Sequence, residues 1–286
     1  MAECAYDLRP LDLDVAGIAR VGALLREVFP EARHFTDAVV RWQYLDNPDG
    51  KAVGFNAWSG DVLAGHYVTI PLRAQVHGKE ERGLLSLNTA THADHRGKGL
   101  FTRLAQATYD RAASEGYGFV VGVANANSTH GFTKKLGFQL VGPLRAMVGV
   151  GPIPFREPRV EPVFEAVRDP AWLSWRLSHP VNRYSMARQG QGMLVLSERR
   201  MKGFRFLLYT TSEGLDGEGL PMTKAPVRKA WIGLGPGYGW KGSAYLNVPM
   251  KRRPSPLNLI FKDLTGAGRQ LDPARTCFQA IDFDTL

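Results

Sequence analysis

Residues 84–101 read LLSLNTATHADHRGKGLF, and the interpretation of the whole chain starts from this stretch. Its first half is apolar and β-branched, which predicts a strand. From Leu100 onward, apolar residues recur at helical spacing as far as Gly116, which is a typical helix stop. The turn between the two contains Gly97 and Gly99. The sequence therefore predicts a strand, a glycine-rich turn and a helix in succession.

A turn of this kind is suited to bind an anion. The first N–H groups of a helix have no partner within the helix, and the positive end of the helix dipole lies beside them. Gly97 and Gly99 lack a Cβ, so a phosphate can approach the backbone closely. Arg96 and Lys98 add positive charge on either side. We therefore expect this turn to bind the diphosphate of a dinucleotide, a nucleoside triphosphate or coenzyme A.

Two common diphosphate motifs do not fit the turn. A Rossmann turn needs a third glycine where this chain has Thr102, and the P-loop pattern is absent. The turn resembles instead the Arg/Gln-x-x-Gly-x-Gly/Ala motif of the GNAT superfamily of acetyl-CoA-dependent N-acetyltransferases. Arg96 and Gly99 match it, and Phe101 replaces the usual small residue. Downstream, the run Lys135-Leu136-Gly137-Phe138 is similar to the Lys-x-Gly-Phe that closes the GNAT core. The resemblance covers roughly residues 8–150.

The predicted elements follow one another in the GNAT order. Together they predict an α/β fold with a mixed central sheet and helices on both faces. The resemblance implies that two central parallel strands splay apart where the cofactor enters, and that residues 1–150 form the acyl-CoA-binding domain. The strands are expected at residues 6–13, 53–58, 62–70, 84–91 and 117–124, and the helices at 15–28, 37–44 and 100–113, with a short helix before Lys135.

A second part of the chain is expected after a proline- and glycine-rich linker at residues 149–158. Residues 151–286 would form a smaller α/β domain that completes the substrate cleft. Asp37, Trp42 and Pro48 recur as Asp169, Trp175 and Pro180, and candidate strands follow at 184–188, 193–197 and 204–210. The recurrence is consistent with a degenerate GNAT-like half, and equally with chance, because a helix, a break and a hairpin are common in succession.

The resemblance implies a set of acyl-CoA contacts. Backbone groups of the central strand would bind the pantetheine amides much as an added strand does, and Asn125 would flank the thioester. Asn127 and Ser128 are expected either to hold the pantetheine arm or to cap the short helix. The expected cofactor-binding residues are Thr89, Ala90, Thr91, Arg96, Gly97, Lys98, Gly99, Leu100, Phe101, Thr102, Asn125 and Asn127.

Acyl transfer to an amine needs a correctly placed neutral amine and a group that accepts its proton. Many GNAT proteins place a tyrosine, as the acid, five residues before the final phenylalanine, and this chain has Thr133 there. The catalytic candidates are His66 as the base, Asn88 or the nearby Ser86 as the holder of a relay water, and Ser128. His92 and His130 border the same region and are alternative bases.

Composition narrows the class of protein. The net charge of +9 arises from scattered basic residues, with no accompanying nucleic-acid motif, and suits an anionic small molecule. Cys4 and Cys277 lack metal-ligand spacing, and their scarcity favours a reducing compartment, although the sequence does not exclude a bridge between them. With no secretory signal and no run of membrane-span length, we expect a soluble, cytoplasmic protein without a metal or a nucleic-acid or membrane partner.

These observations lead to one main functional expectation. The chain would transfer an acyl group, acetyl above all, from acetyl-CoA to the primary amine of a small molecule, for which a nucleotide-linked amino sugar is our candidate. One alternative is a module that binds acyl-CoA as a sensor without turnover. Another is transfer to a peptide or protein amine. The sequence does not indicate the oligomeric state.

Overall fold

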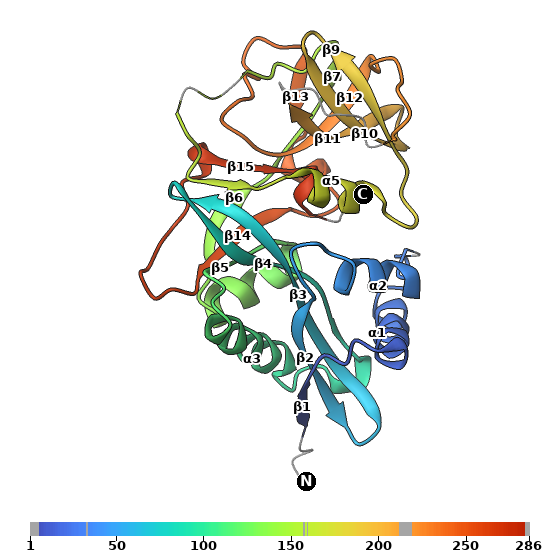
Figure 1. Ribbon diagram of the computed structural model, residues 1–286, viewed down its shortest axis with the longest axis vertical. Helices are drawn as coiled ribbons and strands as arrows, with labels where there is room; N and C mark the ends of the chain where they lie inside the picture. The colour runs from blue at the N-terminus through green and yellow to red at the C-terminus, as the bar shows by residue number, and fades with distance from the viewer. Residues whose placement is uncertain (1–5, 33, 157, 159, 212–218, 284–286) are drawn as a thin grey trace.

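Figure 1 shows a computed structural model of the chain, which describes residues 6–32, 34–156, 158, 160–211 and 219–283. A single connected sheet of 15 strands runs through both halves of the described chain. Its long path follows the order β6-β14-β5-β4-β3-β8-β15-β12-β11-β10-β9. None of the helices in the described ranges is long and apolar enough to cross a membrane.

The first half of the chain contains the predicted strands and helices in the predicted order. Side chains cap the first two helices, since Asp14 accepts from the Gly17 N–H and Thr36 from the Val39 N–H. The elements are β1 (Asp7–Pro10), α1 (Val15–Val28), α2 (Asp37–Tyr44), β2 (Val53–Ser59), β3 (Val62–Val76), β4 (Lys79–Thr91), η1 (Ala93–His95), α3 (Leu100–Ser114), β5 (Phe119–Ala124), α4 (Ala126–His130), η2 (Gly131–Lys135), β6 (Gln139–Pro143) and β7 (Arg145–Val150).

Helices cover both faces of this part of the sheet, as expected from the sequence. Helices α1 and α2 lie on one face and α3 on the other (Figure 1). The α3 face buries Leu100 and Leu104 against Tyr67 and Leu84, whereas the α1 face buries Leu25 against Val68 and Leu85 among others. The alternation of these strand residues between two apolar layers follows from the two-residue period of a strand. The fold is thus α/β with a mixed sheet.

The second half repeats the arrangement of the first. Strands β9, β10 and β11 are antiparallel neighbours, and β12 lies parallel to β11, as β5 lies parallel to β4. Helix α5 precedes β9 as α2 precedes β2. The elements are β8 (Phe164–Ala166), α5 (Pro170–Leu177), β9 (Tyr184–Gln189), β10 (Gly192–Met201), β11 (Phe204–Thr211), β12 (Arg228–Leu234), β13 (Tyr245–Asn247), η3 (Met250–Arg252), β14 (Asn258–Asp263), η4 (Pro273–Arg275), β15 (Thr276–Gln279) and η5 (Ala280–Asp282).

A pair of tryptophans marks the relation between the two halves. Trp42 of α2 and Trp175 of α5 stack with ring centroids 4.8 Å apart. The indole N–H of each donates to the backbone carbonyl of the other, at 2.9 and 3.0 Å. Such reciprocal contacts are those of two equivalent residues about a two-fold axis. They support the interpretation of the sequence echo as a degenerate second half.

The halves exchange one strand each. Strand β14, from the second half, lies between β5 and β6 and pairs with both. Strand β7, from the first half, lies between β12 and β13 of the second. The division at residue 150 therefore does not separate two sheets, because the sheet of each half contains one strand from the other half. Strands that pair across such a distance in the chain leave no local sequence signal of their pairing.

The expected linker begins later than the sequence indicated. Gly149 and Val150 belong to β7 and pair with β12 and β13. A Cβ on Gly149 would lie only 2.3 Å from the carbonyl oxygen of Ala244, so this glycine permits the close approach of two strands. Other boundaries also differ from the expected ones: β1 ends at Pro10 rather than at residue 13, β3 continues to Val76 rather than to residue 70, and β4 begins at Lys79 rather than at residue 84.

The cysteines form no pair within the described chain. Cys277 is a buried, free thiol, and burial raises its pKa to about 12. Cys4 lies outside the described residues, so the bridge considered from the sequence stays untested.

Candidate active site

A bulge in β4 separates the two central parallel strands. The register between β3 and β4 shifts so that two residues of β4, Asn88 and Thr89, oppose the single residue Tyr67. Asn88 adopts a left-handed conformation, with φ at 47°, which bends the strand. Parallel pairing of β4 with β5 ends just before the bulge, at Ser86 and Gly122. The splayed strands expected from the sequence are therefore present, and their cause is the bulge.

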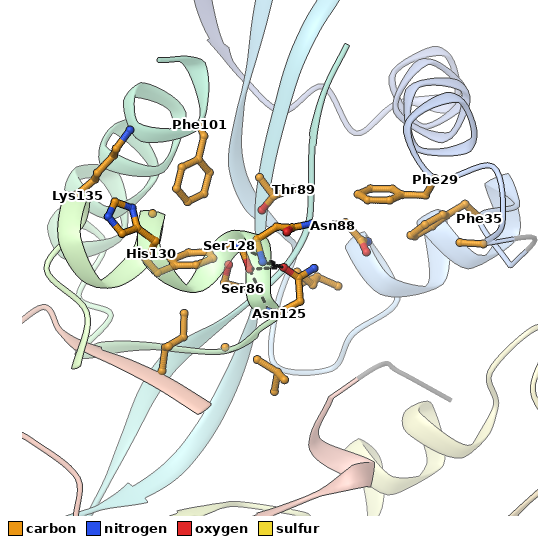
Figure 2. A pocket seen from close by; sticks show the side chains of 18 of the residues that line it. Phe29, Phe35, Ser86, Asn88, Thr89, Phe101, Asn125, Ser128, His130 and Lys135 are labelled. Carbon is orange, nitrogen blue, oxygen red and sulfur yellow. Dashed lines mark hydrogen bonds between the residues drawn. The ribbon is translucent and has the colours of Figure 1, made fainter. Parts of the chain in front are cut away.

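A cavity of about 720 Å³ occupies the gap between the parted strands. Ser86, Asn88, Thr89, Asn125 and Ser128 lie at its middle (Figure 2). Phe29 and Phe35 lie on one side of them, and Phe101, His130 and Lys135 on the other (Figure 2). The remaining lining residues are Ala32, His34, Leu87, Gly122, Val123, Asn127, Gly131, Phe132 and Ile260.

The glycine-rich bend lies at the bare N-terminus of α3. Gly97 and Gly99 have φ values of 74° and 71°, and a Cβ on either would meet nothing within 4 Å. Gly99 is the N-cap of α3 and offers no side chain, unlike the capping residues of α1, α2, α4 and α5. Within the described chain, none of the N–H groups of residues 97–102 donates to a backbone carbonyl. These amides are therefore available to an anion.

A hydrogen-bonded chain behind the cavity fixes the side chain of Asn88. His66 Nδ1 lies 2.7 Å from Asn56 Oδ1, an acceptor, so Nδ1 carries the proton and Nε2 accepts from the Tyr44 hydroxyl at 2.9 Å. The Tyr44 oxygen in turn accepts from Asn88 Nδ2 at 3.2 Å, and the other Asn88 N–H reaches Gln43 Oε1 at 2.7 Å. Both amide N–H bonds of Asn88 are thus used, and its Oδ1 has no hydrogen-bond partner among the described residues.

Sequence and structure comparisons agree with this geometry. The family model for the acetyltransferase (GNAT) domain matches residues 13–141, which span the bulge, the bend and the cavity. The chain contains a GNAT acetyltransferase domain. The matched domain is of the GNAT acetyltransferase family, whose members use acetyl-CoA, and it supports the assignment of the chain as a transferase.

Solved structures with the same fold extend over both halves. A GCN5-related N-acetyltransferase from Anabaena variabilis has a TM-score of 0.61 at 12% identity, over 90% of this chain and 73% of its own. A probable N-acyltransferase from Enterococcus faecalis has a TM-score of 0.60 at 10% identity, over 91% and 73%. Eis1 from Mycobacterium abscessus has a TM-score of 0.58 at 11% identity, over 91% and 74%. No curated protein matched by sequence.

In this GNAT domain, the predicted cofactor-binding residues fall into three groups, which lie in the cavity lining, in β4, and in the bend with the first turn of α3. Asn125, Asn127, Thr89 and Phe101 line the cavity. Ala90 and Thr91 continue β4 and pair with β3, with the Ala90 side chain buried. The others form the bend and the first turn of α3, where Leu100 is buried beneath the helix: Arg96, Gly97, Lys98, Gly99, Leu100 and Thr102.

His66 does not fit the role of general base. It is fully buried and does not line the cavity. Burial lowers its pKa to about 3, because the charged imidazolium would be removed from water. A base with such a pKa takes no proton at neutral pH. The strand pattern placed His66 correctly in β3 but could not show that Tyr44 and Asn56 enclose it.

Ser128 and Asn125 form a capping box at the start of α4. Asn125 Oδ1 accepts from the Ser128 N–H at 3.0 Å and from the Ser128 hydroxyl at 3.1 Å, and the Asn125 N–H donates to Ser128 Oγ at 3.1 Å. These bonds favour the capping role of Ser128 over a catalytic one, since its proton is already donated. Asn127 contributes only its backbone N–H to this cap.

The remaining side chains at positions considered for proton transfer are His92, His130 and Thr133, and they lie apart from one another. His92 Nε2 is 3.0 Å from Glu27 Oε1, outside the cavity. His130 lines the cavity and is exposed. Thr133, at the position of the family tyrosine, donates its hydroxyl proton to the Thr129 carbonyl at 2.9 Å. His92 therefore does not lie where an alternative base would be needed, and Thr133 has no free hydroxyl proton to offer in place of the family tyrosine.

Some cavity residues were not identified from the sequence. Phe29 and Phe35 flank the loop between α1 and α2. The only sequence signal for a role in the cavity was an aromatic residue beside each of two helix ends. Ile260 comes from the exchanged strand β14, and Tyr44 acts from behind Asn88. For these two residues the sequence carries no local signal.

Proposed function

We propose that this chain transfers the acetyl group of acetyl-CoA to the primary amine of a small molecule by direct attack of the amine. The observation that supports this most directly is the parting of β4 from β5 after Ser86 and Gly122. The open bend leads into the same gap, because Phe101, in the first turn of α3, lines the cavity.

The residues present fit acetyl-CoA. The free amides of residues 97–102, with Arg96 and Lys98, would hold the diphosphate. The backbone of Thr89 and the edge of β5 at Asn125 would receive the pantetheine amides. When bound there, acetyl-CoA supplies an activated acyl group. No side chain of the described bend residues blocks the approach of the diphosphate, since Gly97 and Gly99 both face open space.

The role of Asn88 follows from its fixed orientation. Its free Oδ1 can accept one N–H of the acceptor amine and so direct the nitrogen lone pair away from the side chain. The amine must arrive neutral. Lys135 and His130 border the cavity, and no described lining residue is a carboxylate, so the surroundings do not stabilise an ammonium. Attack would form the amide C–N bond and break the thioester C–S bond, so that coenzyme A would leave as its thiolate and the proton released by the amine would pass to solvent.

The test is acetyl transfer itself. Acetyl-CoA and a panel of small amines, amino sugars and peptides would be incubated with the protein, and thiol release would be compared with acetylated product by mass spectrometry. We expect product from small amines above the background without amine. A protein that binds acetyl-CoA in calorimetry but acetylates no amine would be a sensor, an alternative that Thr133 favours. Product from peptides alone would indicate a peptide N-acetyltransferase.

Removing the Asn88 side chain should slow transfer without weakening cofactor binding. For Asn88→Ala we expect kcat to fall by about 10- to 100-fold, because the amine loses its orienting acceptor. The KM for acetyl-CoA should stay unchanged. Tyr44→Phe should lower kcat less, since it only releases the Asn88 amide from one of its two partners.

The control is Gln106→Ala, which removes an exposed amide side chain of α3 outside the cavity. We expect a change in kcat of less than about threefold, as for most surface substitutions. Equal losses in Asn88→Ala and Gln106→Ala would contradict the orienting role. A loss in Asn88→Ala confined to the KM for acetyl-CoA would contradict it as well.

A further inference from the structure

The two sides of the cavity differ in chemistry. The side next to α3 and α4 carries Lys135 and His130, which suit an anionic cofactor (Figure 2). The side next to the α1–α2 loop carries Phe29, Ala32, His34 and Phe35. Since the diphosphate bend lies on the α3 side, the α1–α2 side remains for the acceptor. An acceptor there would contact mainly aromatic and aliphatic groups.

The aromatic side is held in place by the backbone and by Arg26. Phe29 and Phe35 lie with ring centroids 5.9 Å apart, and the rings of His34 and Phe35 lie 4.3 Å apart. Arg26 Nη1 donates to the Phe35 carbonyl at 2.9 Å and to Asp37 at 3.0 Å. The Phe35 side chain is 6% exposed, whereas Phe29 is 37% exposed. Phe29 and Phe35 therefore form a preformed apolar wall, which keeps the entropic cost of binding an apolar group low.

The described titratable side chains that line the cavity are all basic. They are His34, His130 and Lys135, and none is an aspartate or glutamate. A second ammonium on the acceptor would lose water without gaining a counter-charge, which is costly in a partly enclosed site. The many hydroxyls of an amino sugar would likewise face Phe29 and Phe35 rather than hydrogen-bonding groups.

We infer that the acceptor is a primary monoamine with an apolar body, aliphatic or aromatic, and that diamines and amino sugars are poor acceptors. This rests on the proposed acetyl transfer and specifies its substrate class. It replaces the nucleotide-linked amino sugar expected from the sequence, because His34 is the only hydrogen-bonding side chain among the described lining residues of the α1–α2 side. The amine lies beside Asn88 and its body against Phe29 and Phe35.

The decisive comparison uses two amines of equal size. Pentylamine and 1,4-diaminobutane differ only in a terminal methyl or ammonium group. We expect kcat/KM to be at least about tenfold higher for pentylamine, because the second charge is unpaired. We expect 2-phenylethylamine to exceed ethylamine by at least about tenfold, since its ring reaches the aromatic wall. Glucosamine should be slower than either apolar amine.

A charge placed in the wall should reverse the first preference. Phe29→Glu would supply the missing counter-charge, so the ratio of 1,4-diaminobutane to pentylamine should rise by at least about tenfold. The matched control is Val227→Glu, which adds the same charge at an exposed position, 70% accessible, outside the cavity. This control should leave the ratio unchanged.

The outcomes separate this inference from the proposed function. Faster acetylation of 1,4-diaminobutane or glucosamine than of pentylamine by the native protein would overturn the inference and leave acetyl transfer intact. An unchanged ratio in Phe29→Glu, in protein that still acetylates pentylamine, would overturn the placement of the acceptor. Failure to acetylate any amine, despite acetyl-CoA binding, would overturn both.

Discussion

Aspartate in place of Gly99 is expected to weaken acetyl-CoA binding strongly. The new carboxylate would project from the N-cap of α3 into open space, where the free amides are proposed to hold the diphosphate. Two unit charges 4 Å apart repel by about 1 kcal/mol in water and about 4 kcal/mol near a protein surface. The dissociation constant should therefore rise by about 5- to 1,000-fold, measured by isothermal titration calorimetry.

Two control variants separate charge from backbone strain. Gly99→Asn has nearly the same size and the same left-handed φ of 71° but no charge, so it should weaken binding much less than Gly99→Asp. Gly116→Asp carries the same charge at a left-handed glycine, with φ at 81°, beyond the opposite end of α3. It should bind acetyl-CoA as the native protein does. Similar affinities for Gly99→Asp and Gly99→Asn would place the diphosphate elsewhere.

Residues 1–150 expressed alone should fail to fold, although they contain the bend and both parted strands. The fragment lacks β14, which pairs with β5 along six residues from Asn258 to Asp263. Leu259, Ile260 and Phe261 are at most 1% exposed in the whole chain. Burying three such side chains contributes about 5 to 9 kcal/mol, which is comparable to the whole stability of a typical domain. We expect aggregation and no cooperative thermal transition by circular dichroism.

Restoring the exchanged strand should restore the fold. Co-expression with residues 151–286 should yield a soluble complex, because β7 and β14 cross between the fragments. A fragment of residues 1–150 with residues 256–264 attached through a flexible linker should also regain a cooperative transition. Cooperative unfolding and acetyl-CoA binding by residues 1–150 alone would contradict the need for the exchange.

The local elements of the first half could be predicted from the sequence because their signals are local. Apolar spacing fixed α1 and α2, and both helices begin at a side-chain cap. Gly97 and Gly99 identified the bend because left-handed turns favour glycine, and both residues have positive φ. The match of Arg96, Gly99 and the later Lys-x-Gly-Phe identified the GNAT fold, since each motif is a short, contiguous stretch of the chain.

The candidate site could be predicted only in part, because lining a cavity depends on which way a side chain points. Asn88 and Thr89 were named from the sequence, but the bulge that turns them toward the cavity is visible only in the register of β3 and β4. His66 has the residue type of a base, yet its enclosure by Tyr44 and Asn56 leaves its pKa near 3. Residue type suggests a role, whereas burial and hydrogen bonding decide it.

The sequence by itself determined the GNAT domain and the glycine-rich bend ahead of α3, because each depends on short, contiguous stretches of the chain. The tertiary structure alone decided the exchange of β7 and β14, the Trp42–Trp175 pair and the aromatic wall of Phe29 and Phe35. These depend on contacts between distant segments, and such contacts are set by the packing of the whole chain.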